Sequence, residues 1–493
     1  MIKRIVLSAL TILTLLFTGC INDTLITPNN EINDFVWKGM NSWYNWQPNV
    51  DDLADSKDDN NVAYTSFLNS YDEPKDLFQG LLYDHPNTDR FSWFVEDYVV
   101  QNNQFQGISL SFGLRLQGVT LSDDDNSTDD DAILYVRYVA PDSPASNAGI
   151  NRGDIINALD GTVLKDSNYD AVTSKLGNET ITFSFVSESA GTLTFIEDKT
   201  ITRAEITDNP VHFKKVFNDI NGKKVGYLVY NGFRSSYNDE LNEAFAFFKT
   251  ENIDELVLDL RLNGGGSVLT SSYLASMMYA TAGTDIFAEL RFNSKHTNQN
   301  GTYEFDNTLN VYNVNGDKTG TEVINRLNGL SQLYVLASSS TASASEMIIN
   351  GLKAFIPVKV TGTTTFGKNV GSITLYDSPS SDYTDESTAS KSHLNAMQPI
   401  VFQIYNKLGQ SDYTQGFDPD IEVKEYQYWN NILPFGDENE VVLKAALDDI
   451  RGVSAKSLPS TLYKNMKELE VLQLEKRFDK EMYIDHDFFE NNR

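Results

Sequence analysis

Two short segments of the sequence carry residues that could act together in acyl transfer. Residues 341–346 (TASASE) join a predicted strand to a predicted amphipathic helix, so Ser343 should lie at a turn over the helix N-terminus. Backbone N–H groups without helical partners stabilise negative charge there, which suits a nucleophile whose reaction forms an oxyanion. The serine alone is weak evidence, because Ser345 could be an ordinary N-cap and such turns are common.

The second segment, residues 363–371 (TTTFGKNVG), has Lys368 in a loop of small residues beside an aromatic residue. A surface lysine is charged and cannot act as a base. Burial against apolar groups lowers the amine pKa, so a buried Lys368 could take the proton of Ser343 without a histidine. The five histidines of the chain have no recognisable nucleophile or metal spacing. These residues favour a Ser-Lys hydrolase, which needs no metal or cofactor.

A glycine turn is the third candidate element. Residues 259–266 (DLRLNGGG) read as the end of a strand, a turn and the start of a helix. Glycines let the backbone direct its N–H groups toward a bound oxygen, so an oxyanion hole is the natural use. A phosphate loop is the alternative, but no Gly-Lys-Ser/Thr follows, and the net charge of -30 disfavours anionic substrates.

Together these segments resemble the carboxyl-terminal processing proteases, also called tail-specific proteases. That family carries D-L-R-x-N-x-G-G, then S-A-S-E with the first serine catalytic, then F-G-K with the lysine catalytic. Here Ser343 and Lys368 are 25 positions apart, as in the family. The resemblance covers roughly residues 105–450, including GYLVY at 226–230 and GFDPD at 416–420. It implies an α/β core related to the crotonase and Clp-protease folds.

The resemblance also implies the remaining site residues. The N–H of Ala344 and a glycine N–H of the 264–266 turn, from Gly265 or Gly266, would form the oxyanion hole. Many members have a glutamine four residues after the lysine, whereas this chain has Ser372. A hydroxyl has a shorter reach but could still orient the amine through one hydrogen bond. Glu346 is expected to be structural at the helix start rather than an acid catalyst.

A β-rich module is predicted upstream, at residues 104–204. The segments PDSPASNAGI (141–150), GDII (153–156) and DG (160–161) resemble a PDZ domain. The carboxylate-binding loop of that family would be Ser111, Phe112, Gly113 and Leu114, and a bound peptide would add as a strand beside it. Alternatively, Gly113 marks a simple β-bulge.

The first twenty residues read as an export signal. Lys3 and Arg4 precede an apolar run, and LFTGC at 16–20 resembles a bacterial lipobox, which implies lipidation of Cys20. The alternative is an ordinary signal peptide that leaves a soluble periplasmic enzyme. Because Cys20 is the only cysteine, no disulfide can form within a monomer.

Length and charge set the remaining expectations. A chain of 493 residues exceeds one usual hydrophobic core, and the net charge of -30 argues against nucleic acid as a partner. We predict a multidomain α/β protein, and we interpret the acidic stretch 122–131 as a solvated loop rather than a calcium site. The expected parts are a signal peptide (1–19), an N-terminal helical region (20–103), the PDZ-like domain (104–204), the catalytic core (205–455) and a C-terminal helical tail (456–493).

The sequence therefore predicts an exported serine endopeptidase of the bacterial cell envelope. It would be anchored to the membrane through Cys20 and would cleave protein or peptide substrates whose free C-termini bind the PDZ-like domain. One rival is a non-catalytic, peptide-binding surface lipoprotein with a decayed protease core. Another is a glycan-binding surface protein, suggested only by the aromatic residues near the N-terminus.

Overall fold

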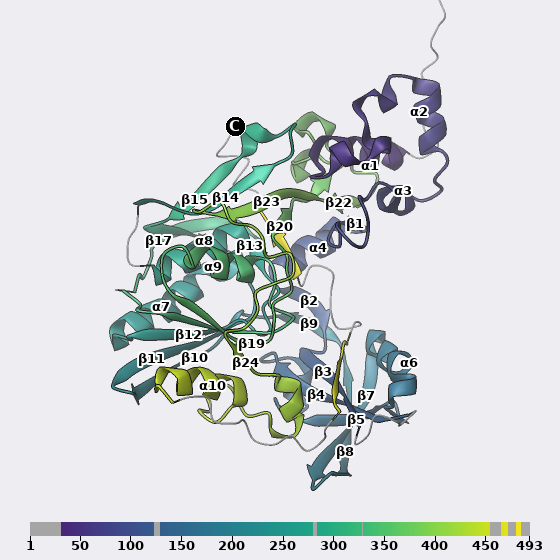
Figure 1. Ribbon diagram of the computed structural model, residues 1–493. Coiled ribbons are helices and arrows are strands. Elements are labelled where there is room, and N and C mark those ends of the chain that lie inside the picture. Colours follow the sequence, from purple (N-terminus) through teal and green to yellow (C-terminus); the bar gives the residue numbers. More distant parts are fainter. Residues whose placement is uncertain are drawn as a thin grey trace, which may run out of the picture.

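The computed structural model describes residues 31–122, 129–279, 283–327, 329–453, 465–471 and 480–484. N-terminal helices, a β-rich module and a larger α/β core form its three parts (Figure 1). Within these ranges no helix combines the length and apolar character that crossing a membrane requires. The predicted signal peptide and Cys20 lie outside the described residues.

The N-terminal part is helical, as predicted. Its first helix is covered by the other helices and the core, and it buries Phe35, Trp37, Met40 and Trp43. The short strand β1 then pairs antiparallel with β22 and joins this part to the core. The bounds are α1 Glu31–Trp43, α2 Asn61–Leu68, α3 Pro74–Gly80, β1 Trp93–Val95, α4 Tyr98–Phe105 and β22 Ala396–Gln398.

The β-rich module has a hydrophobic core of its own, which includes Phe112, Leu134 and Phe183. Its sheet has the order β25-β3-β4-β5-β7-β8, with β6 beside β5. The separate pair β2 and β9 lies where the chain enters and leaves the module. The bounds are β2 Ile108–Ser111, β3 Leu114–Leu121, β4 Asp131–Val139, α5 Pro144–Asn147, β5 Ile155–Leu159, β6 Thr162–Val163, α6 Tyr169–Thr173, β7 Thr180–Ser189, β8 Thr192–Thr202, β9 Ala204–Thr207 and β25 Lys467–Leu469.

The core is built on a six-stranded sheet of order β10-β11-β12-β18-β19-β24, parallel except for β10. Its central strands β12 and β18 are buried at every position because helices cover both faces. Leu256 and Leu258 pack with α7, α8 and α9, whereas Val257 packs with α10 on the other face (Figure 1). The bounds are β10 Val211–Ile220, β11 Lys223–Tyr230, α7 Asn238–Glu251, β12 Glu255–Asp259, α8 Val268–Met278, β18 Leu333–Ala337, α9 Ala344–Leu352, β19 Val358–Gly362, β24 Ile421–Glu422 and α10 Val441–Ile450.

A second six-stranded sheet, of order β13-β26-β20-β23-β14-β15, lies beside the helices of the core. Strand β26 comes from the C-terminal segment and pairs parallel with both β13 and β20. The bounds are β13 Gly266–Ser267, β14 Gly283–Phe292, β15 Gly301–Phe305, β20 Val370–Ser372, β23 Ile400–Asn406 and β26 Met482–Tyr483. Outside this sheet, β16 Thr308–Tyr312 pairs with β17 Lys318–Val323, and β21 Leu375–Tyr376 pairs with β22.

The C-terminal segment differs from the predicted helical tail. Its described residues, 465–471 and 480–484, include the strands β25 and β26 and no α-helix. Each strand completes a sheet of another part of the molecule: β25 lies against the β-rich module and β26 against the core (Figure 1). The backbone hydrogen bonds offered by those sheets outweigh the local helical pattern around Met466 and Leu469.

Candidate active site

Ser343 lies at the N-terminus of α9, at the junction predicted from the sequence. Its φ of +64° and ψ of -115° are rare for a residue with a side chain, and such strain costs on the order of 1–3 kcal/mol. The side chain is fully buried, and its Oγ has no hydrogen-bond partner among the described residues. The fold therefore holds one unpaired hydroxyl in a strained position at a helix start.

Glu346 connects the serine segment to the lysine segment. One carboxylate oxygen accepts hydrogen bonds from the Ser343 N–H at 2.9 Å and the Lys368 N–H at 2.8 Å. The other accepts from Thr365 Oγ1 at 2.5 Å and the Gly367 N–H at 2.7 Å. Burial raises the pKa of Glu346 to about 7, although these hydrogen bonds act in the opposite direction. Glu346 is thus structural, and it fixes both candidate catalytic segments at once.

Lys368 is buried, with 1% of its surface exposed. Burial lowers the pKa of its amine, in the direction that a general base needs. The Nζ lies 4.9 Å from the centroid of the Phe91 ring, and Arg90 donates a hydrogen bond to the Gly367 carbonyl at 3.1 Å. The N-terminal part, for which the sequence indicated no chemical role, therefore supports the lysine loop.

The amine of Lys368 contacts Glu481 rather than Ser343. Its Nζ donates to Glu481 Oε2 at 2.6 Å, and both side chains are 1% exposed. Ser372 Oγ donates to Glu481 Oε1 at 2.5 Å and accepts from Gln398 Nε2 at 2.7 Å. Ser372 is therefore linked to the lysine through a carboxylate and not by the direct contact that the sequence suggested. Burial raises the pKa of Glu481.

The glycine turn lies against the nucleophile. Gly265 and Gly266 have φ values of +122° and +133°, which side-chain-bearing residues rarely adopt. A Cβ at Gly265 would lie 2.8 Å from Ser343 Cβ and 3.1 Å from the Ala344 nitrogen, so the glycine turn meets the serine segment. The Gly265 N–H donates to Asn263 Oδ1 at 2.9 Å, and the Gly266 N–H donates to the Glu481 carbonyl at 2.6 Å. Both glycine amides are therefore engaged.

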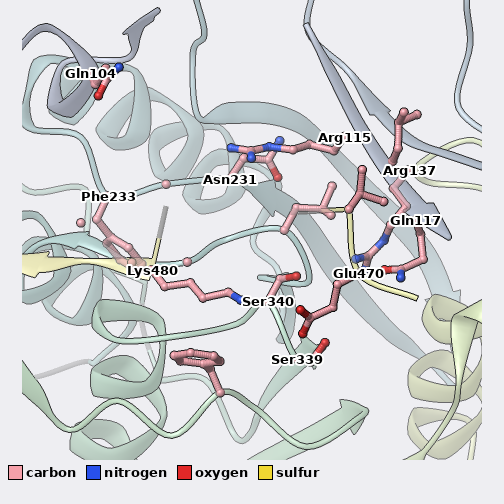
Figure 2. Close-up of a pocket in the computed structure, with 18 of the residues that line it drawn as sticks. Gln104, Arg115, Gln117, Arg137, Asn231, Phe233, Ser339, Ser340, Glu470 and Lys480 are labelled. Carbon is pink, nitrogen blue, oxygen red and sulfur yellow. The ribbon is translucent and has the colours of Figure 1, made fainter. Parts of the chain in front are cut away.

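The predicted carboxylate-binding loop lies in the β-rich module, apart from these residues. Gly113 has a φ of +80°, and its N–H donates to Ser111 Oγ at 3.0 Å. Phe112 is buried in the core of the module, and Leu114 begins β3. A cavity of about 330 Å³ lies between β3 and the glycine turn, and the close-up view shows side chains entering it from both sides (Figure 2).

Two family matches bear on this geometry. Residues 31–93 match the profile described as "Peptidase S41 N-terminal domain", and residues 224–423 match "Peptidase family S41". The two matches together cover more than half of the chain. They include the candidate catalytic and oxyanion-hole residues, from Gly265 to Ser372. The chain belongs to peptidase family S41. This family consists of serine peptidases that use a Ser-Lys dyad.

Individual S41 relatives are distant in sequence. A carboxyl-terminal-processing protease from Picosynechococcus sp. is 28% identical over 273 residues, which are 55% of this chain and 59% of that protein. A chloroplastic C-terminal processing peptidase from Tetradesmus obliquus is 26% identical over 297 residues, 58% of this chain and 57% of that protein. The match thus spans somewhat more than half the length of these curated relatives.

The fold agrees with a solved S41 structure. The crystal structure of a putative S41 protease from Bacteroides fragilis aligns with a TM-score of 0.63 and 26% identity, over 87% of this chain and 99% of that chain. The multidomain α/β architecture is therefore that of an S41 protein.

Glu481 is the site residue that sequence reasoning missed. It lies beyond the S41 match, 113 positions after Lys368, in a tail that the sequence indicated only as packing or surface helix. No motif surrounds it. Only its burial beside the lysine shows that it belongs to the site.

Proposed function

We propose that this S41 protein is a serine endopeptidase of the carboxyl-terminal processing type, with Ser343 as nucleophile and Lys368 as general base. The observation that carries the proposal is the Glu346 carboxylate, which accepts hydrogen bonds from the backbone N–H groups of both residues. A buried carboxylate shared in this way sets the two segments side by side, with the glycine turn in contact with both Ser343 and Ala344.

The reaction follows from these positions. The neutral amine of Lys368 takes the proton of Ser343 as the hydroxyl attacks a peptide carbonyl. The Ala344 N–H opens α9 and has no acceptor within the helix, so it can stabilise the oxyanion together with a glycine N–H from Gly265 or Gly266. The leaving amine takes the proton from Lys368, and water then hydrolyses the acyl-enzyme by the same base.

The described arrangement is a resting state of this site. For catalysis the Lys368 amine must turn from Glu481 toward Ser343, and a glycine N–H must be released from its present acceptor. A second candidate, the non-catalytic peptide-binding lipoprotein, is favoured by one observation: Ser343 Oγ has no hydrogen-bond partner among the described residues.

The cellular setting is part of the proposal. We propose export through residues 1–19, lipidation at Cys20 and attachment to the bacterial cell envelope, with the β-rich module binding substrate C-termini as a PDZ domain does. Support comes from the lipobox-like residues and, for the module, from the positive φ of Gly113 where β3 begins. Mass analysis of the mature N-terminus tests the anchor, and an unmodified Cys20 contradicts it.

Cleavage of a panel of peptides tests the activity. Ser343→Ala and Lys368→Ala should each remove turnover, whereas the exposed controls Ser187→Ala and Lys318→Ala should keep it. An acylating probe should label Ser343 in the wild type, and proteomics of chain termini with and without Ser343→Ala would report the substrates. Turnover near the wild-type value in either catalytic variant contradicts the proposal.

A further inference from the structure

We propose that the C-terminal segment of this chain is its own ligand: residues 465–471 and 480–484 occupy the path of an extended peptide substrate, from the edge of β3 to the glycine turn, and keep the protease inactive. That these residues occupy a substrate path depends on the proposed protease function. That the tail binds β3 and the glycine turn depends only on contacts in the structure.

The first contact is on the β-rich module. Strand β25 pairs antiparallel with β3, with Lys467 opposite Thr120 and Leu469 opposite Gly118. Gln117 Nε2 donates to the Leu469 carbonyl at 2.7 Å. Addition of an extended segment to a sheet edge is a common mode of peptide recognition. The tail is therefore bound to this module as a peptide ligand would be.

Strand β25 lies beside β3 and next to α6. A Cβ at Gly118 would lie 3.0 Å from Leu469 Cβ and 2.0 Å from the Tyr169 hydroxyl of α6, so the tail and α6 meet over this glycine. Val471, two residues further on, is buried in the core of the module. The tail thus lies along β3 next to α6 and runs toward the end of β3 that begins at Leu114.

The second contact is at the candidate active site. Strand β26 lies between β13, which carries Gly266, and β20, which carries Ser372. The Glu481 carbonyl accepts the Gly266 N–H at 2.6 Å and would lie 2.4 Å from a Cβ built on Gly265. That same point is 2.8 Å from Ser343 Cβ. A tail carbonyl therefore accepts the hydrogen bond of one candidate oxyanion-hole donor, close to the nucleophile.

The side chain of Glu481 adds a second block. The Lys368 amine donates a hydrogen bond to Glu481 Oε2 at 2.6 Å. While this hydrogen bond is formed, the amine is directed at Glu481, and Ser343 Oγ has no hydrogen-bond partner among the described residues. Ser343 itself has no exposed surface in this arrangement.

One cavity joins the two contacts. It is lined by Glu470 and Val471 from the first tail segment, by Lys480 and Tyr483 from the second, and by the glycine turn. In the close-up view Glu470 points toward Ser339, and Lys480 extends toward Ser340 (Figure 2). Nine positions separate Val471 from Lys480, a span of at most roughly 30 Å for an extended chain. A substrate that fills both contacts must therefore present a long unfolded end.

The test uses two substitutions in the full chain, each of which weakens binding of the tail at one of its two contacts. Leu469→Asp puts a charge in the contact with β3, far from the chemistry, and Glu481→Gln removes the carboxyl group beside Lys368. The matched controls are Leu408→Asp, at a 65% exposed leucine, and Glu205→Gln, at an exposed glutamate. If the tail is bound about 90% of the time, its release should raise kcat/KM roughly tenfold. A synthetic peptide of residues 465–484 should then inhibit both variants competitively.

The outcomes separate this inference from the proposed function. Activity that rises in both tail variants, but in neither control, supports the inference. Activity that is unchanged or lower in both variants of an active enzyme overturns it, and a loss in Glu481→Gln alone would make Glu481 a positioning residue for Lys368. If every form is inactive, the same labelled peptide is titrated into Ser343→Ala with and without Leu469→Asp. About tenfold tighter binding to the double variant supports the tail as a ligand, and equal binding overturns it.

Discussion

Two buried carboxylates approach Lys368, and they come from regions that are built differently. Glu346 lies in the first turn of α9, and three of its four hydrogen-bond donors are backbone N–H groups. Glu481 lies in a tail segment of five described residues, and its side chain contacts the side chains of Lys368 and Ser372. Contacts to the backbone of a packed core belong to the framework, whereas a short terminal strand can detach without global unfolding. Glu346 is therefore part of the framework of the site, whereas Glu481 belongs to the tail segment that occupies the site.

The largest effect is expected from Glu346→Gln. The glutamine amide has one acceptor oxygen where the carboxylate has two. Its NH₂ group would point at hydrogen-bond donors and could not accept their hydrogen bonds. We expect at least a ~100-fold loss of kcat/KM and a loss of about 2–4 kcal/mol in the free energy of unfolding, since buried donors are left unpaired. Peptide cleavage and urea unfolding measure the two effects. Activity equal to the wild type would show that Glu346 does not hold the two segments together.

The pH dependence of stability should report the same carboxyl group. Its folded pKa of about 7 exceeds the unfolded value of 4.5, so the folded state binds more protons between these pH values. Its contribution to the free energy of unfolding is therefore full below pH 4.5 and is lost as pH rises to about 7, by up to about 3 kcal/mol. Urea unfolding at pH 5 and pH 8 should show this loss in the wild type but not in Glu346→Gln. An identical pH difference in both proteins would assign the effect to other groups.

The two carboxylates should also differ in their effect on the pH–rate profile. Burial lowers the pKa of Lys368, and Glu481 opposes this shift. Without the Glu481 carboxylate the amine should lose its proton at a lower pH, so Glu481→Gln should move the rising limb of kcat/KM to lower pH. Glu346→Gln should lower the whole profile because it disturbs geometry first. A rising limb that moves to higher pH in Glu481→Gln would contradict the assignment.

The smallest effect concerns the backbone of Ser343. Because its φ is +64°, glycine should fit this position with less strain than alanine. We expect Ser343→Gly to be more stable than Ser343→Ala by about 1 kcal/mol, with both inactive. Thermal unfolding of the two variants, compared at equal pH, measures the difference. Equal stability of the two variants would show that the positive φ at this position does not destabilise a residue with a side chain.

Much of the fold could be predicted from local pattern. The strand expected before Ser343 is β18, the helix expected after it is α9, and the β-rich module expected upstream is present. These segments are buried and strongly periodic, so local preference and tertiary packing favour the same structure. The described part of the tail is the opposite case, because the edge of the β-rich sheet takes up residues of the expected helical stretch as β25.

The amino-acid sequence by itself determined the local chemistry: a serine where a strand meets a helix, a glycine turn that tolerates positive φ, and a lysine 25 positions after the serine. Only the tertiary structure decided which groups these residues meet. The amine of Lys368 pairs with a carboxylate 113 positions away, and the Gly266 N–H pairs with the carbonyl of that same residue. Spacing along the chain specifies short-range geometry, whereas burial and charge pairing depend on contacts between segments that no local pattern connects.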